Sequence, residues 1–292
     1  MITNALTVDV EDFFHVSAFS RVIPQKNWEK YESRVEKNTL KLLEIFKKRG
    51  VSATFFVLGW VAEKYPDLVK EIDSHGHEVA SHGYSHKLIY NQGKTEFYEE
   101  TKYAKELLED IIGKEIKGYR AASYSITQKS LWALEILHEL GFEYDSSIFP
   151  VIHDRYGIPH SPRSPYKIKM QDGKFLKEFP LSTTSIFGLT LPIAGGGYFR
   201  LYPYFLSEKL ITRHIKQNQP YVFYIHPWEI DPGQPRVQAG LISRFRHYNN
   251  LSVCLSRLEL LLKKITFTTM ENVFSNYKCL EEMSLDELEG IR

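Results

Sequence analysis

Six residues of this 292-residue chain could form a catalytic metal site: a histidine pair, an acidic cluster and a lone histidine near the C-terminus, namely His82 and His86, Asp9, Glu11 and Asp12, and His226. Two imidazoles and one carboxylate suit a divalent metal that keeps open positions for water and substrate. Such a metal polarises a carbonyl group and lowers the pKa of its bound water toward about 7. The remaining carboxylate and histidine would then serve as base and acid.

A histidine pair at this spacing is weak evidence by itself, because surface or core histidines explain it as readily. Its position favours a metal site, since His82 and His86 lie among small residues directly after an apparent strand, residues 77–80. The acidic cluster strengthens this interpretation, because a carboxylate completes the set that such metals use.

Apolar runs alternate with helical patterns along most of the chain, and glycines at 50, 76, 113 and 141 end the expected helices. Each candidate reactive residue follows a run that is typical of a strand. The pattern therefore predicts parallel βα units, and closure into a barrel is preferred to an open sheet. The expected strands are residues 5–10, 51–58, 77–80, 116–120, 142–145, 221–226 and 265–270.

The alternation of strand and helix patterns stops between residues 149 and 202, where prolines are frequent and Asp172-Gly173 predicts a hairpin. The glycine run 195–197 lacks the spacing of a phosphate-binding loop, so we expect flexibility or a close backbone approach to a ligand. Near the end, Thr268 and Glu271 could cap a terminal helix, and the acidic chain from Glu281 onward is expected to be poorly ordered.

Composition excludes several classes of protein. The 37 basic and 36 acidic residues give a net charge of +1, which implies neither nucleic acid nor an acidic membrane surface as a partner. Cys254 and Cys279 are the only cysteines, so a disulfide scaffold or a thiolate zinc site is not expected. No signal peptide or apolar run of about 18 residues is present, which predicts a soluble, cytoplasmic protein without a transmembrane segment.

Five segments, residues 7–12, 81–86, 119–124, 144–147 and 224–226, resemble the motifs of the polysaccharide deacetylase family, also called the NodB-homology family or carbohydrate esterase family 4. The resemblance covers roughly residues 5–226 and implies a distorted (β/α)7 barrel, here with a short C-terminal helical extension. Three segments resemble a bacterial subgroup that is linked to exosortase and exopolysaccharide gene clusters. They are residues 8–12, 226–229 and 244–248.

The resemblance also implies roles for individual residues. Asp9 would be the general base and His226 the general acid, and Arg120 would hold Asp9 by a charge-assisted hydrogen bond. The metal would be zinc, with cobalt, nickel or manganese as alternatives. The metal ligands would be His82, His86 and either Asp12 or Glu11, and the substrate and oxyanion contacts would come from Ser123, Tyr124 and Trp228.

The chain departs from the family pattern directly after the base, where most members place the metal aspartate and this chain has Val10. Strand alternation and a related branch of the family favour Glu11, whereas the shorter side chain of Asp12 matches the usual ligand. We list both and slightly prefer Asp12.

Two further departures concern substrate contacts. Residues 121–123 lack the proline and aromatic residue that the family often has there, which leaves the shape of the acyl pocket open. The segment 153–156 is either a solvated turn or a substrate contact. Aromatic stacking on a sugar and plain packing are both open for Trp60, Tyr198 and Trp228.

The resulting prediction is one domain over residues 1–270, with residues 227–265 as a family-specific segment inside it, followed by a C-terminal helix and acidic tail over residues 271–292. The predicted activity is metal-dependent removal of N-acetyl groups from a polysaccharide or its precursor. An allantoinase-like cyclic amide hydrolase and an inactive polysaccharide-export binding protein are the alternatives. Expected partners are an N-acetylated carbohydrate and the exopolysaccharide-synthesis machinery, and peripheral membrane association is an option.

Overall fold

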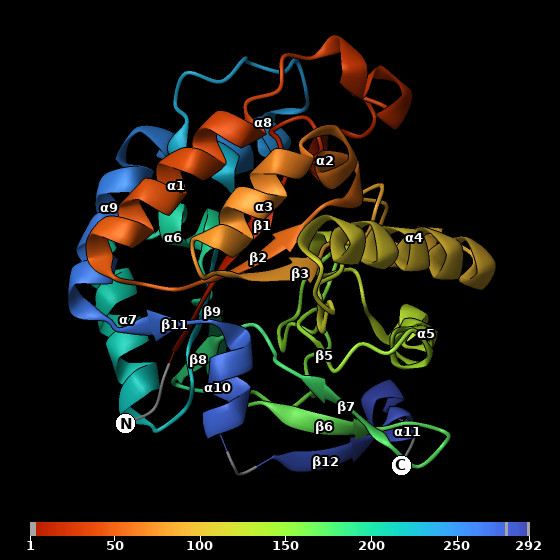
Figure 1. Ribbon diagram of the computed structural model, residues 1–292. Coiled ribbons are helices and arrows are strands. Elements are labelled where there is room, and N and C mark those ends of the chain that lie inside the picture. Colours follow the sequence, from red (N-terminus) through yellow and green to blue (C-terminus); the bar gives the residue numbers. More distant parts are fainter. Residues whose placement is uncertain (1–3, 278–279, 291–292) are drawn as a thin grey trace.

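Parallel strands form the centre of the molecule (Figure 1). The computed structural model describes residues 4–277 and 280–290, and within these ranges seven strands lie side by side in parallel, in the order β10, β1, β2, β3, β4, β5 and β7. Their bounds are β1 (Asn4–Val10), β2 (Thr54–Val57), β3 (Glu78–Ser81), β4 (Gly118–Tyr119), β5 (Tyr144–Asp145), β7 (Phe175–Glu178) and β10 (Val222–Ile225). β1 is buried along its whole length, as its continuous apolar run predicts for a strand covered on both faces.

Helices alternate with these strands along the chain and pack on them through one large apolar core. In α1, Leu42, Leu43 and Phe46 are buried, and Gly50 ends the helix in the left-handed conformation that glycine adopts at little cost. The predicted α/β fold, with parallel strands in a distorted barrel, is confirmed. The helices are α1 (Val35–Arg49), α2 (Gly59–Lys64), α3 (Pro66–Ser74), α4 (Lys94–Ile112), α5 (Trp132–Glu139), α7 (Tyr204–Lys216) and α9 (Leu251–Lys264).

Two β-hairpins lie between β5 and β10 in the chain. β6 (Tyr166–Lys169) pairs with β7 as an antiparallel hairpin, so the hairpin predicted at Asp172-Gly173 is confirmed. A second hairpin, β8 (Thr183–Ile186) and β9 (Leu189–Pro192), leads to Ala194, whose carbonyl oxygen accepts a hydrogen bond of 2.7 Å from the backbone N–H of Tyr224 in β10.

The glycine run leads into α6 (Gly196–Leu201) and lies close against Tyr224 of β10. A Cβ atom on Gly195 would lie 2.1 Å from the carbonyl oxygen of Tyr224, and one on Gly196 would lie 2.3 Å from the tyrosine ring. The contact with β10 therefore requires glycine at both positions.

The C-terminal part is ordered where we expected a poorly ordered acidic tail, and that prediction was wrong. β12 (Glu281–Ser284) pairs in parallel with β6, and Leu288 of α11 (Leu285–Glu289) is fully buried. Before it, β11 (Phe267–Thr268) pairs with β1, and α10 (Met270–Asn276) is capped by Thr269, one residue after the predicted cap. Pairing with a strand more than 100 residues away leaves no local signal in the sequence.

The remaining helices are α8 (Leu241–Tyr248) and the 3-10 helices η1 (Ser17–Phe19), η2 (Gln25–Lys30), η3 (Ile89–Asn91), η4 (Ala122–Tyr124), η5 (Gln128–Ser130) and η6 (Pro227–Ile230). Across the described ranges, no helix combines the length and apolar character that a membrane crossing needs. Cys254 is a buried free thiol, and Cys279 lies outside the described residues.

Asp12 fixes the start of α1. Its Oδ2 accepts hydrogen bonds from the backbone N–H groups of Arg34 (2.5 Å) and Val35 (3.0 Å) and from the hydroxyl of Ser33 (2.9 Å). Its Oδ1 accepts one from the N–H of Phe13 at 2.8 Å. A carboxylate at this position satisfies free N–H groups and interacts favourably with the helix dipole.

We predict that Asp12→Ala lowers the free energy of unfolding by about 2 kcal/mol, because it leaves buried N–H groups without an acceptor. Asp12→Asn should cost less, since the amide keeps one oxygen. Urea unfolding monitored by circular dichroism measures both. Exposed Asp67→Asn serves as the control, and wild-type stability in Asp12→Ala would contradict a capping role.

A second prediction concerns Asp145 and Glu178, which lie opposite each other on β5 and β7 and are both fully buried. Burial, together with the negative charge of Asp145, raises the pKa of Glu178 well above its usual range. A raised carboxyl pKa means that the folded state binds the proton more tightly. The protonated side chain of Glu178 therefore stabilises the folded state fully below about pH 4.3, the ordinary pKa of glutamate. This stabilisation is lost as the pH rises toward the raised pKa of the folded state.

Glu178→Gln should remove this dependence, because the amide donates a hydrogen bond without needing a proton. Urea unfolding between pH 5 and pH 8 should show wild-type stability falling relative to the variant. Parallel curves for the two proteins would contradict the raised pKa of Glu178.

Candidate active site

Parallel strands bring four of the predicted residues to one edge of the sheet. Asp9 lies at the end of β1, and His82, Arg120 and His226 directly follow β3, β4 and β10. Because these strands are parallel, their carboxyl ends meet on the same side. The sheet thus gathers residues that are more than 200 positions apart in the sequence.

Asp9 and Arg120 form a buried ion pair. Nη1 of Arg120 lies 2.7 Å from Oδ1 of Asp9, and the two residues are 0% and 2% exposed. The guanidinium also donates to the hydroxyl of Thr7 at 2.7 Å and to the carbonyl oxygen and hydroxyl of Ser146 at 3.2 and 3.0 Å. Burial alone would lower the pKa of Arg120, but the charge of Asp9 raises it. The pair holds Asp9 in a fixed orientation.

Glu11, His82 and His86 form a compact cluster, in which one potential ligand atom from each lies within 4.8 Å of the others. Oε2 of Glu11 is 2.6 Å from Nε2 of His86, and Oε1 accepts a hydrogen bond of 3.1 Å from the indole N–H of Trp228. Burial alone would raise the pKa of Glu11, but the nearby imidazoles of His86, His226 and His82 lower it. The cluster therefore presents an ionised carboxylate beside two imidazoles.

His82 is held in one tautomer. Its Nδ1 lies 2.7 Å from the carbonyl oxygen of Arg120, so Nδ1 carries the hydrogen and Nε2 keeps a lone pair. Burial lowers the pKa of His82 to about 4, which keeps the ring neutral at pH 7. A neutral, oriented imidazole and a buried carboxylate are the donors that a divalent metal requires, so the residues fit such an ion.

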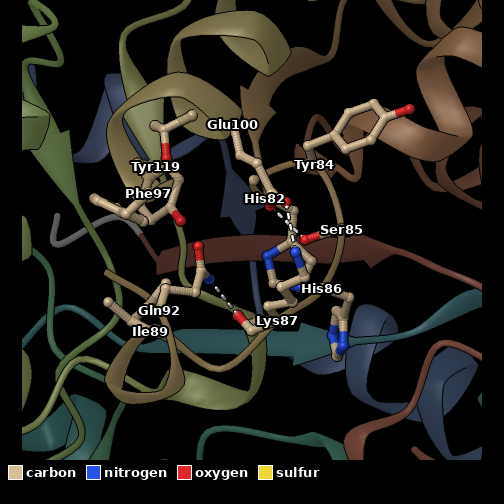
Figure 2. Close-up of a pocket in the computed structure, with 13 residues that line it drawn as sticks. His82, Tyr84, Ser85, His86, Lys87, Ile89, Gln92, Phe97, Glu100 and Tyr119 are labelled. Carbon is tan, nitrogen blue, oxygen red and sulfur yellow. Dashed lines mark hydrogen bonds and ion pairs between the residues drawn. The ribbon is translucent and has the colours of Figure 1, made fainter. Parts of the chain in front are cut away.

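A hydrogen-bonded loop positions His86, whose backbone has a left-handed φ of 52°. Figure 2 shows the surrounding side chains: the hydroxyl of Ser85 donates to Glu100 of α4, and Nζ of Lys87 lies 2.9 Å from the same carboxylate. The amide of Gln92 donates to the carbonyl oxygen of Lys87 at 3.1 Å. The cavity among these residues holds about 10 Å³, which is too small for any ligand larger than water. This region therefore supports the histidines rather than binding substrate.

Glu11, and not Asp12, lies with His82 and His86 in the structure, which is the opposite of our slight preference for Asp12. Glu11 directly follows β1, and its carboxylate and that of Asp9 lie 3.6 and 3.8 Å from Nε2 of His226. The carboxylate of Asp12 instead accepts three hydrogen bonds at the start of α1 and one from the backbone N–H of Phe13. The start of α1, more than 20 residues after Asp12 in the sequence, therefore fixes the orientation of the Asp12 carboxylate.

Glu229 and Arg200 are site residues that the sequence analysis missed. Oε2 of Glu229 lies 3.0 Å from Nδ1 of His226, and Oε1 accepts a hydrogen bond of 2.6 Å from Nε of Arg200. Burial alone would lower the pKa of His226, but the hydrogen bond and charge of Glu229, with the charges of Glu11 and Asp9, raise it to about 9. His226 is therefore a charged imidazole at neutral pH, able to give up a proton.

A local signal for Glu229 did exist. The short helix η6 begins at Pro227, and His226 is its N-cap residue. The side chain of Glu229, three residues later, folds back to accept a hydrogen bond from the backbone N–H of His226, as in a capping box. Arg200 has no such signal. Its guanidinium also donates to backbone carbonyls of residues 246, 247 and 249, so its position depends on the packing of α6 against the end of α8.

Trp228 is buried, which favours packing over sugar stacking, the two alternatives that the sequence left open for this residue. Its ring is stacked with the rings of His226 and His247, at 5.0 and 4.1 Å between centroids. Its N–H donates to Glu11. Trp228 thus supports Glu11 and His226 from the core.

Ser123 and Tyr124 lie in the loop after Arg120, both with positive φ, at 51° and 56°. Such backbone strain in non-glycine residues costs about 1–3 kcal/mol each and is concentrated at functional sites. The hydroxyl of Ser123 pairs with that of Ser17 at 2.8 Å, and the hydroxyl of Tyr124 lies 3.4 Å from Oδ2 of Asp9. The loop is therefore next to the candidate base.

Two larger cavities flank the site. One, of about 190 Å³, is lined by residues that include His15, Trp28 and His86. The other, of about 300 Å³, is lined by residues that include Tyr198 and Tyr224, together with residues 153 and 156 of the segment whose role was open. Trp60 instead packs in an aromatic cluster with its ring under Nζ of Lys64.

Comparisons with known proteins agree with this geometry. Residues 28–144 match a family model described as polysaccharide deacetylase, and residues 146–275 match one described as a domain of unknown function, DUF3473. A peptidoglycan-N-acetylglucosamine deacetylase of Bacillus cereus is 36% identical over 98 residues, which are 33% of this chain and 36% of that protein. A peptidoglycan deacetylase of Helicobacter pylori is 30% identical over 132 residues, which are 45% of this chain and 41% of that protein. The chain thus spans well under two thirds of these relatives.

Solved structures share the fold over nearly the whole chain. A protein of Mycobacterium smegmatis, described as a candidate polysaccharide deacetylase, aligns with a TM-score of 0.61 at 18% identity, covering 97% of this chain and 94% of that one. A family 4 carbohydrate esterase of Streptomyces lividans in complex with acetate aligns with a TM-score of 0.50 at 14% identity, covering 96% and 98%. Residues 28–144 are therefore similar to the polysaccharide deacetylase family, and the chain shares the fold of the solved carbohydrate esterase family 4 structure.

Proposed function

We propose that the chain is a metal-dependent hydrolase that removes N-acetyl groups from an N-acetylated polysaccharide or its precursor. The names of the Bacillus cereus and Helicobacter pylori relatives support the class of reaction. The observation that carries the proposal is that a carboxylate and a charged imidazole lie beside one donor cluster. Oδ2 of Asp9 is 3.8 Å from Nε2 of His226, and Oε1 of Glu11 is 3.6 Å from the same nitrogen.

Glu11, His82 and His86 would hold the metal. When bound, a divalent ion supplies Lewis acidity that polarises the amide carbonyl and acidifies water. Zinc, cobalt, nickel and manganese all accept two imidazoles and a carboxylate, so the donor set favours none of the four.

The side chains around the cluster would perform the proton transfers. Asp9 would take a proton from the attacking water as the new carbon–oxygen bond forms at the acetyl carbonyl. His226 would give its proton to the nitrogen as the carbon–nitrogen bond breaks, which leaves acetate and a free amine. Tyr124 and the backbone near Ser123 would contact the acyl side of the substrate.

Arg120 and Glu229 would act through these two groups. Arg120 would orient Asp9 by the 2.7 Å contact between them. Glu229 holds Nδ1 of His226 at 3.0 Å and so directs Nε2 toward the cluster. Each catalytic group would thus have a buried partner of opposite charge.

We predict that Asp9→Asn and His226→Ala each reduce acetate release by a factor of about 10² to 10⁴, because each removes one proton transfer. The assay uses metal-reconstituted protein and N-acetylated oligosaccharides. Asp67→Asn and Glu44→Gln, both on the exposed surface, are controls that should keep full activity. Full acetate release by Asp9→Asn would exclude the proposed base, and turnover of a cyclic ureide alone would favour the cyclic amide hydrolase.

A separate prediction tests the role of Glu229. Glu229→Gln should lower kcat by about 10- to 100-fold while KM changes less than about twofold, because His226 would remain but lose its charged partner. Steady-state kinetics separate the two parameters, and thermal unfolding checks that the buried contact with Arg200 survives. An increase in KM with an unchanged kcat would show instead that Glu229 shapes the binding site.

A further inference from the structure

Helix α8 presents an unusual face to solvent. Leu241, Ile242 and Phe245 are 82%, 70% and 59% exposed, and their spacing places them together on one side of the helix. Single exposed apolar side chains are common on proteins, but a contiguous group marks an interaction surface.

The apolar surface continues onto the neighbouring elements. Phe245 and Leu201, which is 47% exposed, line the same cavity of about 300 Å³ as His153. Ile152, next to His153 in the sequence, is 90% exposed. Nη1 of Arg246 lies 3.9 Å from Oδ1 of Asp154, which connects α8 to this loop. The three elements therefore form one rim.

The same region is basic. From residue 232 to residue 258 the sequence contains four arginines, at 236, 244, 246 and 257, and no aspartate or glutamate. Arg257 binds backbone carbonyls of residues 199, 200 and 202, and Arg236 lies over the ring of Tyr248. Arg244 forms no ion pair with any residue that the structure describes. The nearly neutral total charge of the chain conceals this local excess.

The rim lies beside the candidate active site. Tyr224 lines the same cavity, and its ring centroid is 5.6 Å from that of His226 and 5.1 Å from that of Tyr124. Anything that docks on the rim is therefore close to the mouth of the site.

We propose that this rim, formed by Ile152, Leu201, Leu241, Ile242, Phe245, Arg244 and Arg246, docks on the surface of an anionic lipid bilayer. Aliphatic and aromatic side chains flanked by arginines are the combination that inserts into the interface of acidic lipids. A symmetric contact with a second copy would place the arginines of the two rims against each other, which is unfavourable. The inference does not depend on the proposed reaction.

Flotation with unilamellar vesicles tests the docking. Wild-type protein should float with vesicles of equal phosphatidylglycerol and phosphatidylcholine at low salt and much less with pure phosphatidylcholine. The triple variant Leu241→Ser, Ile242→Ser, Phe245→Ser should reduce the partition coefficient by about tenfold or more. Arg244→Gln should reduce it by about fivefold, and only at low salt.

Phe187 and Leu189 provide a matched control, because they are 101% and 68% exposed on the separate β8–β9 hairpin. Phe187→Ser with Leu189→Ser should bind vesicles like wild type, and all variants should keep wild-type circular dichroism. Absence of wild-type binding, or equal binding by the triple variant, would overturn the proposal. So would a concentration-dependent dimer, seen by light scattering, that the triple variant abolishes.

Discussion

The site depends on one buried ion pair, Asp9 with Arg120. Two charges removed from water are stable only when nearly every polar atom is satisfied, and breaking such a pair from one side costs about 3–5 kcal/mol. Here the guanidinium contacts Asp9 and Thr7 on β1 and Ser146 just after β5, so it joins three strand ends. The carbonyl oxygen of the same arginine orients His82. A single residue therefore fixes both the candidate base and one candidate metal ligand.

The other half of the site follows the same rule with a different pair. Arg200 and Glu229 form a buried ion pair, and the carboxylate of Glu229 also contacts the charged imidazole of His226. These residues lie in the part of the chain that matches DUF3473, whereas Asp9 and Glu11 precede residue 28, where the match to the polysaccharide deacetylase model begins. The site is therefore assembled from three stretches of sequence, and its completeness depends on how the C-terminal half packs against β1 and β3.

Much of this arrangement could be predicted from the sequence, because the strands and helices have strong periodic patterns and glycine stops. The gathering of Asp9, His82, Arg120 and His226 followed from parallel strands. What could not be predicted depends on contacts distant in the sequence. Asp12 is held by the start of α1, His247 stacks with Trp228, and β6 pairs with the acidic C-terminal segment as β12.

The central claim is that Glu11, and not Asp12, completes a metal site with His82 and His86. Metal content after reconstitution and dialysis, measured by mass spectrometry for wild type, Glu11→Gln and Asp12→Asn, tests it most directly. Glu11→Gln should bind at least about tenfold more weakly than wild type, whereas Asp12→Asn should retain wild-type metal content. Retention of metal by Glu11→Gln together with loss by Asp12→Asn would contradict the account.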